Sequence, residues 1–423
     1  MHTAFTPTEK TSDVIVIGGG AAGMMAALFA AQEGARVTLL EKNEKLGKKI
    51  YITGKGRCNV TNQCDADTFL QNVPRNPRFL YSALRLMNPD DLLSLLQQYG
   101  CDTKVERGRR AFPVSDKASD VTRALEKALR QHGVQIMLNT RVTGLVRDGG
   151  GLCAVRTDKG VLPCGAAVIC TGGVSYPSTG STGDGYLFAE EMGLNVTERK
   201  PSLVGLLTRE TWPMELQGLT LKNVCLTGMS CGKIIYSELG EMLFTHFGVS
   251  GPLVIELSSH LPDKGETVFC LDLKPGLTRE QLDQRLQREI KAAGKKQVNS
   301  ILQTLLPQRM AAVFAKVCGM EGTKVCSQVT GRERSLMVEM LKKLPLTVKG
   351  TRPIAEAIVT RGGVDVKEIA PGTMAAKKIP NLFFAGEVMD VDAHTGGYNL
   401  QIAFSTGALA GKNAAKLIKD RNE

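Results

Sequence analysis

Three glycines at residues 18, 20 and 23 have the spacing G-x-G-x-x-G, and a carboxylate, Glu41, follows eighteen residues after the last of them. Gly18 allows a sharp turn, Gly20 has no Cβ to hold a phosphate away, and Gly23 lets a helix lie close to a sheet. The start of such a helix offers unpaired N–H groups to a pyrophosphate, and Glu41 can accept a hydrogen bond from a ribose hydroxyl. The pattern predicts an adenine-dinucleotide site, and the alternative is a glycine-rich turn in an ordinary α/β sheet.

The segments around these residues follow the order that this motif requires. Val14–Ile17 is a β-branched run that predicts a buried strand, and Met24–Glu33 is Ala-rich and apolar, as in a buried helix. Gly34 ends the helix, and Arg36–Glu41 predicts a second strand that ends on the carboxylate. The sequence therefore predicts a strand–turn–helix–strand unit of an α/β fold.

A basic, glycine-punctuated loop, Lys42–Asn62, follows the carboxylate and is expected to lie over the dinucleotide. Surface solvation accounts for most of its lysines. Its glycines permit close backbone approach, and a guanidinium can face a phosphate or the edge of a flavin. The residues of this loop predicted to contact the cofactor are Lys42, Gly54, Arg57, Cys58 and Asn59, although a small packing residue is the default role of Cys58.

Two later segments repeat the pattern of glycines at a strand end or a helix start. The strand predicted at Ala166–Cys170 ends in Thr-Gly-Gly, and the GSTGDG stretch at Gly180–Gly185 opens a helix. We expect these segments to approach the dinucleotide closely, because glycine removes the side chain that would keep a ligand away. The residues predicted to bind there are Thr171, Gly172, Gly173 and Asp184.

The end of the chain mirrors its start. Leu382–Ala385 predicts a strand, Val388–Gly397 a loop, and Tyr398–Ala415 a helix whose first N–H groups can face the N1–C2=O edge of a flavin. A nicotinamide coenzyme would not need a closing segment so far along the chain. We read Asp390 as an acceptor on the ribityl or phosphate side and Asp392 as structural. The cofactor-binding residues predicted here are Gly386, Glu387, Asp390, Gly396, Gly397, Tyr398, Asn399 and Leu400.

The middle of the chain has a different character. From about Asn195 to Leu273, short alternating runs, Leu253–Leu257 among them, predict an antiparallel sheet or small barrel, and Leu277–Leu344 reads as helical. Between Lys274 and Lys349 there are 15 Lys and Arg against 6 Asp and Glu. Such a surplus attracts nucleic acid or an anionic substrate, or it is the solvated face of amphipathic helices, which we favour because no aromatic stacking pattern accompanies it.

Composition limits the class of protein. The chain has 423 residues, a net charge of +11 and eleven cysteines, with no C-x-x-C pair and no Cys/His spacing typical of a zinc site. Met1–Ser12 carries no signal-peptide pattern, and no apolar run reaches the length of a membrane span. We expect a cytoplasmic protein with reduced thiols and no metal.

Five motifs together resemble one known family. They are GGGAAG at Gly18–Gly23, ITGKGRCNVTN at Ile52–Asn62, FPVSDKASDV at Phe112–Val121, FTHFGVSGP at Phe244–Pro252 and FAGEVMDVDAHTGGYNLQIAFSTG at Phe384–Gly407. The chain resembles, over almost its full length, the bacterial FAD-dependent family of the BaiN/RdsA type, which includes a bile-acid 3-oxo-Δ4,6 reductase and aminoacetone-oxidase-like flavoproteins. The resemblance implies a Rossmann-like two-dinucleotide-binding FAD domain, interrupted by a β-barrel-like part and a small helical part. It also implies FAD contacts at Ala22, Glu41, Arg57, the Val142 backbone, Glu387 and the Gly397–Leu400 helix start.

The domain boundaries expected from these patterns are residues 1–194 and 361–423 for the FAD-binding domain. The β-rich domain takes 195–273 and 346–360, and the basic helical domain takes 274–345.

The flavin performs hydride transfer at N5, so the protein has to supply orientation and a proton. Candidate catalytic residues are His246 and His394, whose side chains titrate near neutrality, and Tyr398 at the start of the last helix; a structural role is the alternative for each. No second G-x-G-x-x-G appears, so a dedicated NAD(P)H domain is not expected. Either NAD(P)H docks transiently as the electron donor, or the reduced flavin comes from another source, or the enzyme is an oxidase that uses O₂.

Three functions stay open at this stage. The first is reduction of an activated C=C bond, such as that of a steroid-like or bile-acid-like enone, with NAD(P)H as donor. The second is oxidation of an amine or aminoketone by O₂, and the third is a nucleic-acid-binding or RNA-modifying flavoprotein. We expect a small hydrophobic or carboxylate-bearing substrate and no stable nucleic-acid partner.

Overall fold

The computed structural model describes residues 12–149 and 151–422, and its contacts divide the chain into two units. Of the described residues, those up to Ser202 and from Ile354 onward form the first unit, and Leu203–Pro353 form the second. The expected boundaries after residue 194 and before residue 361 differ from this division. The reason is that β10 (Lys200–Ser202) and β17 (Val359–Arg361) pair with each other inside the first unit. The segment 1–11 and Gly150 lie outside the described residues.

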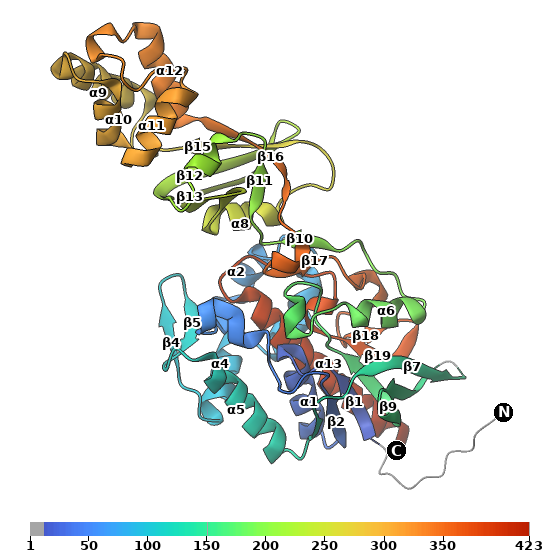
Figure 1. The fold of residues 1–423 in the computed structure, drawn as a ribbon. Coiled ribbons are helices and arrows are strands. Elements are labelled where there is room, and N and C mark those ends of the chain that lie inside the picture. The colour runs from blue at the N-terminus through green and yellow to red at the C-terminus, as the bar shows by residue number, and fades with distance from the viewer. Residues whose placement is uncertain (1–11, 150, 423) are drawn as a thin grey trace. The chain divides into compact units, whose positions relative to one another are not determined.

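A sheet of mostly parallel strands, with antiparallel strands at its edges, forms the centre of the first unit (Figure 1). Its strand order is β18-β19-β9-β1-β2-β6, and β7 and β8 extend it through β9. Val14, Ile15 and Val16 of β1 are fully buried, as expected for a central strand covered on both faces. The strands are β1 (Ser12–Ile17), β2 (Val37–Leu40), β6 (Gln135–Met137), β7 (Val142–Asp148), β8 (Gly151–Thr157), β9 (Gly160–Ile169), β18 (Ala375–Ala376) and β19 (Ile379–Phe384).

The first and last helices of the chain pack against each other beside this sheet. They are α1 (Ala21–Gln32) and α13 (Tyr398–Asn422). Gly407 and Gly411 of α13 face α1, and a Cβ at either residue would stand 2.2 Å or 2.0 Å from a backbone oxygen of α1. Glycine at these positions therefore allows the two ends of the chain to meet at close range.

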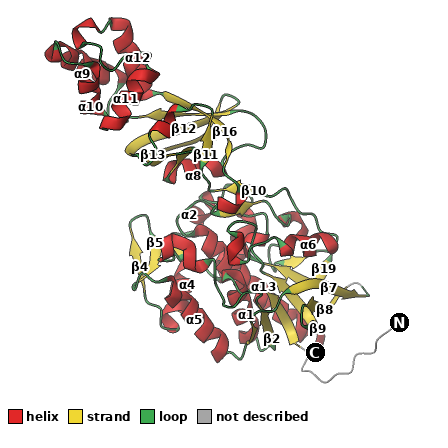
Figure 2. Cartoon of the chain, in the orientation of Figure 1, coloured by secondary structure: helices red, strands yellow, loops and turns green. Residues whose placement is uncertain are grey.

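The remaining elements of the first unit surround this core (Figure 2). The three-stranded sheet has the order β3-β5-β4. The strands are β3 (Thr61–Asn62), β4 (Thr103–Glu106) and β5 (Arg110–Pro113), and the helices are α2 (Ala66–Gln71), α3 (Tyr81–Leu86), α4 (Pro89–Gln98), α5 (Ala118–Gln131) and α6 (Asp184–Glu191). The 3₁₀ turns are η1 (Ile50–Gly56), η2 (Pro77–Leu80), η3 (Pro177–Thr179), η5 (Ile354–Glu356), η6 (Val366–Glu368) and η7 (Gly386–Val388).

The second unit contains a closed barrel, as the alternating runs predict. Its strand order is β11-β14-β13-β12-β15-β16. The strands are β11 (Leu206–Thr208), β12 (Thr220–Ser230), β13 (Lys233–Thr245), β14 (Gly248–Ser250), β15 (Thr267–Asp272) and β16 (Leu344–Thr351), with the short helix α7 (Trp212–Glu215). The strand predicted at Leu253–Leu257 is wrong: the segment is helix α8 (Pro252–Ser259). Pro252 occupies its first turn, and Leu253, Val254 and Leu257 are buried on one face at helical spacing.

The helical part of the second unit is also where the sequence predicts it. Its elements are α9 (Arg279–Ala293), α10 (Val298–Leu305), α11 (Gln308–Val317), η4 (Cys326–Gln328) and α12 (Gly331–Lys342). Leu282, Leu286 and Phe314 are fully buried in a core that the helices share with the barrel. Thr278 and Thr330 close capping boxes at the starts of α9 and α12, which fixes where these helices begin.

Two further observations concern the whole described chain. Each of the eleven cysteines is free. Among the helices of residues 12–149 and 151–422, none combines the length and apolar character needed to cross a bilayer.

Candidate cofactor site

A cavity opens in the first unit where several strands of the parallel sheet reach their carboxyl ends. Gly18 follows β1, Glu41 follows β2, Cys170 follows β9 and Ala385 follows β19, and all four line the cavity. In open α/β sheets this edge is where ligands bind. The predicted cofactor residues that line the cavity are Gly18, Gly20, Ala22, Glu41, Lys42, Val142, Thr171, Gly172, Asp184, Gly386, Glu387, Asn399 and Leu400.

The glycine turn between β1 and α1 has the geometry that a pyrophosphate needs. Gly18 has φ +103°, and a Cβ on Gly23 would stand 1.8 Å from the Gly18 oxygen, so both positions require glycine. Gly23 serves this packing rather than lining the cavity. Gly20 is the N-cap of α1, no side chain caps the helix there, and no atom lies within 4 Å of where its Cβ would stand. The first N–H groups of α1 therefore lie beside open space, which fits a bound diphosphate.

Glu41 is buried at the opposite side of this turn, with 7% of its surface exposed. Its Oε2 accepts a hydrogen bond from the Gly19 N–H at 2.7 Å, and its Oε1 accepts from the backbone N–H and the Nδ2 of Asn43 at 2.8 and 2.6 Å. A carboxylate can accept about four hydrogen bonds, so one acceptor position remains for a ribose hydroxyl. The residues present fit the adenosine part of FAD.

Lys42 and Asp184 line the cavity, but they bind each other. The Lys42 Nζ lies 2.7 Å from Asp184 Oδ2 and donates to Thr182 Oγ1 at 2.5 Å. Asp184 is the first residue of α6, and Lys42 follows β2. The pair connects two segments 142 residues apart and closes one side of the cavity.

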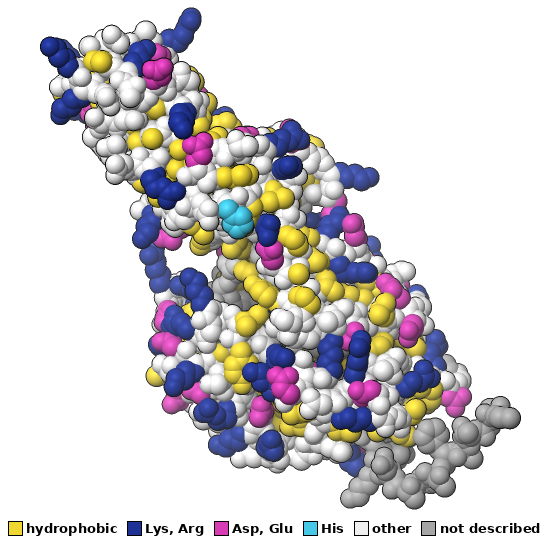
Figure 3. All heavy atoms as spheres, in the orientation of Figure 1, with side chains coloured by type: hydrophobic (Ala, Val, Ile, Leu, Met, Phe, Trp, Pro, Cys, Tyr) yellow, Lys and Arg dark blue, Asp and Glu magenta, His cyan; other side chains and the backbone are white. Residues whose placement is uncertain are grey.

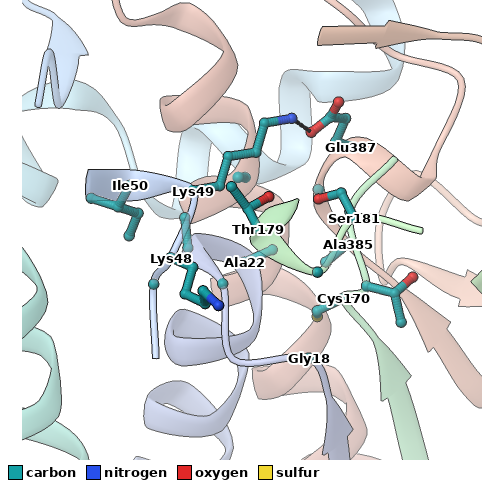
Figure 4. A pocket seen from close by; sticks show the side chains of 18 of the residues that line it. Gly18, Ala22, Lys48, Lys49, Ile50, Cys170, Thr179, Ser181, Ala385 and Glu387 are labelled. Carbon is teal, nitrogen blue, oxygen red and sulfur yellow. Dashed lines mark hydrogen bonds and ion pairs between the residues drawn. The ribbon is translucent and has the colours of Figure 1, made fainter. Parts of the chain in front are cut away.

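Glu387 lies on the other side of the cavity and is held by three donors. Lys49 Nζ lies 2.6 Å from Glu387 Oε2, while Ser175 Oγ and the Thr360 N–H donate to Oε1 at 2.9 Å each. Lys49 also donates to Ser175 Oγ at 2.6 Å. Figure 4 shows the Lys49 and Glu387 side chains reaching toward each other. An ammonium has three N–H donors, so one remains for a bound group.

The first turn of α13 reaches the cavity through Asn399 and Leu400. Asn399 Oδ1 accepts from the Ala393 N–H at 2.9 Å, and its Nδ2 donates to the carbonyls of Ala393 and His394 at 2.7 and 3.2 Å. Asn399 thereby fixes the loop that precedes the helix.

Four predicted residues of the basic loop do not line the cavity. Arg57 forms ion pairs with Glu106 and Asp116 and stacks over the Phe112 ring at 4.2 Å. These contacts hold its guanidinium against β4 and the segment after β5, and its contact with the cofactor stays a prediction. Cys58 is buried, which raises the pKa of its thiol to about 12, and a Cβ on Gly54 would stand 2.7 Å from the Asn59 nitrogen. Gly54 and Cys58 thus have packing roles here, whereas the Asn59 Oδ1 is buried without a hydrogen-bond partner among the described residues, and the binding role of Asn59 stays a prediction.

Four further predicted binding residues also lie off the cavity. Gly173 packs where a Cβ would stand 2.3 Å from Thr360 Oγ1, and Gly397 where one would stand 2.4 Å from the Thr61 carbonyl carbon. Gly396 accepts a hydrogen bond from Asn62 through its carbonyl oxygen. Asp390 accepts from the Gly362 N–H at 3.1 Å, and burial raises the pKa of its carboxyl. Asp390, Gly396 and Gly397 thereby hold the closing loop, while Gly173 packs against Thr360.

The two candidate catalytic residues of the first unit do not line the cavity either. His394 Nδ1 lies 3.2 Å from Asn72 Oδ1, and burial lowers the pKa of its imidazole. Tyr398 is 7% exposed and packs edge-on against Phe69 at 5.1 Å. Both contacts favour the structural alternatives. His246 lies between β13 and β14 in the second unit, with its ring 5.0 Å from that of Phe247, and its catalytic role stays a prediction.

Several cavity residues were outside the prediction. They include Asn43, Lys48, Lys49, Thr179, Ser181 and Ile358. Lys48 and Lys49 belong to the loop that the sequence places over the dinucleotide, so their position was a usable signal. The partner of Lys49 is 338 residues away, and no local pattern indicates it.

Comparisons with known proteins identify the family of the chain. The model of the HI0933-like protein Rossmann domain matches residues 12–413. The chain is 32% identical over 400 residues to the ribosomal RNA dihydrouridine synthase of Escherichia coli K12, covering 93% of this chain and 96% of that protein. It is 30% identical over 411 residues to the 3-dehydro-bile acid delta(4,6)-reductase of Clostridium scindens, covering 95% and 98%.

Solved structures show the same fold at low sequence identity. The E. coli quinol fumarate reductase subunit FrdA has a TM-score of 0.54 at 16% identity, over 98% of this chain and 71% of that chain. The 3-ketosteroid delta1-dehydrogenase of Sterolibacterium denitrificans has a TM-score of 0.51 at 15% identity, over 97% of this chain and 100% of that chain. Because the family model covers nearly the whole chain, the protein belongs to the HI0933-like family and is an FAD-dependent oxidoreductase.

Proposed function

We propose that the protein reduces a C=C bond conjugated with a carbonyl group, with NAD(P)H as a transient electron donor. The observation that carries this proposal is that two full-length relatives have names that denote one type of reaction. Dihydrouridine arises by reduction of the uracil C5=C6 bond, which is conjugated with the C4 carbonyl. The Δ4,6 bonds of a 3-dehydro bile acid are conjugated with the 3-oxo group.

FAD, when bound and reduced by NAD(P)H, would supply a hydride from N5 to the electron-poor carbon of such a bond, and a proton would complete the reduction at the neighbouring carbon. The chain's own residues provide binding and orientation. The start of α1 offers N–H groups for the diphosphate, and Glu41 offers its remaining acceptor position for the ribose. Lys49, held by Glu387 and Ser175, keeps a positively charged donor at a fixed place in the cavity.

Two substrate classes share this reaction. A steroid-like or bile-acid-like enone is the class that the sequence favours first. A uridine in RNA is the second class, and the positive surplus of residues 274–349 supports it, since RNA carries one negative charge per phosphate, whereas a bile acid carries a single carboxylate. Of the two full-length relatives above, the dihydrouridine synthase has the slightly higher identity.

The experiment is anaerobic reduction of the purified flavoprotein by NADH or NADPH in a stopped-flow instrument. The reduced protein is then mixed with a Δ4,6-3-oxo steroid or with uridine-containing RNA. We expect bleaching of the flavin by one nicotinamide donor, and re-oxidation by one substrate with a product heavier by two hydrogens. Peroxide release with an amine or aminoketone under air, without product from either conjugated substrate, would instead support the oxidase alternative.

A further inference from the structure

We propose that one end of the helical part in the second unit is a docking surface for the phosphate backbone of RNA. This inference rests on the uridine class of the proposed function. We call the surface the basic end, and it consists of Arg288, Lys291, Lys295, Lys296 and Arg332. All five side chains are exposed.

Most carboxylates of the helical part are already neutralised by other cations. Arg279 pairs with Glu339, Arg334 with Asp283, Arg285 with Glu289 and Lys324 with Glu333. Two more cations are tied to acids of the barrel part, because Lys316 pairs with Glu215 and Lys342 with Asp272. The net positive charge of residues 274–349 therefore comes from the Lys and Arg side chains that take no part in these ion pairs.

The helix packing brings five of these remaining cations to one end, while Lys274, Arg309, Lys343 and Lys349 belong to other parts of the segment. Arg279 at the start of α9 pairs with Glu339 near the end of α12, while Asp283, one turn later, pairs with Arg334 in the first turns of α12. The two helices are therefore antiparallel. The end of α9, with Arg288 and Lys291, runs toward the start of α12, where Arg332 lies.

The loop after α9 is held at the same end. The Cys326 N–H donates to the Lys296 carbonyl at 2.9 Å, and the Ser327 N–H donates to the Gly294 carbonyl at 3.1 Å. These bonds fix the backbone of Lys295 and Lys296 against η4, four residues before α12 begins. Five unpaired cations on a rigid frame are thus presented together.

The acids of α9 and α12 nearest to this end, Glu289 and Glu333, are engaged by other side chains. Glu289 accepts from Arg285 at 2.8 Å and from Thr304 at 2.6 Å, and Glu333 accepts from Lys324 at 2.6 Å. Figure 3 shows Lys and Arg side chains over the helical part, with fewer acidic ones among them.

The chemistry of this surface fits a nucleic-acid backbone better than a membrane. Binding to a bilayer surface needs apolar side chains beside the cations, and the large apolar side chain exposed in the described helical part is Leu336, at 38%. Binding to a phosphate backbone requires only cations spaced along the surface. Carboxylates that are already paired with cations repel the phosphates only weakly. A phosphate-rich RNA is therefore the partner that the basic end fits.

The test uses the full-length flavoprotein and a fluorescently labelled RNA hairpin with uridines in its loop. Binding is measured by anisotropy over a series of salt concentrations. The variant K295A/K296A removes two cations of the basic end. The matched control K343A/K349A removes two exposed lysines outside it, one after α12 and one in β16, and leaves the same net charge.

We expect the slope of log K against log salt to fall by about 1.4 to 1.8 in K295A/K296A, since each phosphate contact contributes about 0.7 to 0.9. The control should keep the wild-type slope, and both variants should keep their flavin. Equal losses in the two variants would overturn the inference, as would tighter binding to anionic lipid vesicles than to the hairpin.

The outcome separates this inference from the proposed function. Formation of dihydrouridine by a K295A/K296A variant that binds RNA as the wild type does would overturn the docking surface and leave the function intact. Loss of slope in K295A/K296A without any dihydrouridine in the wild type would support the surface and contradict uridine as the substrate.

Discussion

Gly407 of the last helix lies so close to Ala22 of the first that a Cβ at residue 407 would stand 2.2 Å from the Ala22 carbonyl oxygen. Ala22 lines the cofactor cavity, and Asn399, two turns before Gly407, lines it as well. The contact joins the two ends of the chain where the predicted FAD site forms. Because the contact requires glycine at residue 407, a substitution there tests it directly.

Replacing Gly407 with Ala should destabilise the first unit and loosen the cofactor. A Cβ at 2.2 Å forces the two helices apart, and overpacking of this kind costs about 1 to 3 kcal/mol. Urea unfolding and the flavin retained after gel filtration are the measurements. Gly331→Ala is the control, because Gly331 lies in a helix and no atom lies within 4 Å of its Cβ position. This variant should leave the unfolding free energy and the retained flavin unchanged or slightly improved. Equal behaviour of the two variants would contradict the packing argument.

Glu41→Gln should weaken FAD binding by about 10- to 100-fold. The substitution removes the charge that strengthens the hydrogen bonds from Gly19 and Asn43, and such bonds contribute about 1.5 to 3 kcal/mol. Isothermal titration of the apoprotein with FAD gives the dissociation constant. Glu44→Gln, an exposed carboxylate beside Lys48, is the matched control and should change the constant little. A constant that stays at the wild-type value in both variants would remove Glu41 from the binding site.

Lys49 and Glu387 should behave as a coupled pair. Lys49→Met leaves the Glu387 carboxylate, with 16% of its side chain exposed, without its cation, and we expect a loss of about 1 to 3 kcal/mol of unfolding free energy. The double variant K49M/E387Q should lose less than the sum of the two single variants. A double-mutant cycle on urea unfolding measures this coupling, and additive losses would mean that the two side chains do not interact in solution.

His394 should make the protein less stable in acid. Burial lowers the pKa of its imidazole below the ordinary value of 6.5, so the unfolded chain takes up the proton more readily than the folded one. The stability that the neutral ring contributes is fully present above the ordinary pKa of 6.5. It is lost as the pH falls from there through the lowered pKa of the folded state. The unfolding free energies of wild type and His394→Gln, compared from about pH 8 to about pH 5, should shift in favour of the variant as the pH falls. A difference that is independent of pH would show that the ring is not buried in its neutral form.

Much of the architecture could be predicted because its signals are local. The β-branched run at Val14–Ile17, the glycine turn and the alternating runs of the insertion each carry the period of their own element. Leu253–Leu257 failed because a short apolar run fits a strand or a buried helix equally well, and the Gly-Pro pair before it was the deciding signal.

The site was predictable where a backbone requirement marks the residue, as at Gly18. The site was not predictable where the role of a side chain depends on an ion-pair partner that is far away in the sequence. Arg57 lies in the expected loop, but its guanidinium forms ion pairs with Glu106 and Asp116. Lys49 lies in the same loop, whose lysines were mostly attributed to surface solvation, and it forms an ion pair with Glu387 in the cavity. Sequence shows which groups carry charge, and only the fold decides which opposite charge each one meets.

The most direct measurement of the central claim is the identity and amount of flavin released when the purified protein and its Gly20→Ala variant are denatured. No protein atom lies within 4 Å of the added Cβ, so the variant should fold as the wild type does. It would nevertheless place a methyl group where the diphosphate approaches α1. The account predicts FAD from the wild type and much less from the folded variant. A colourless wild type, or a variant that retains FAD in full, would contradict it.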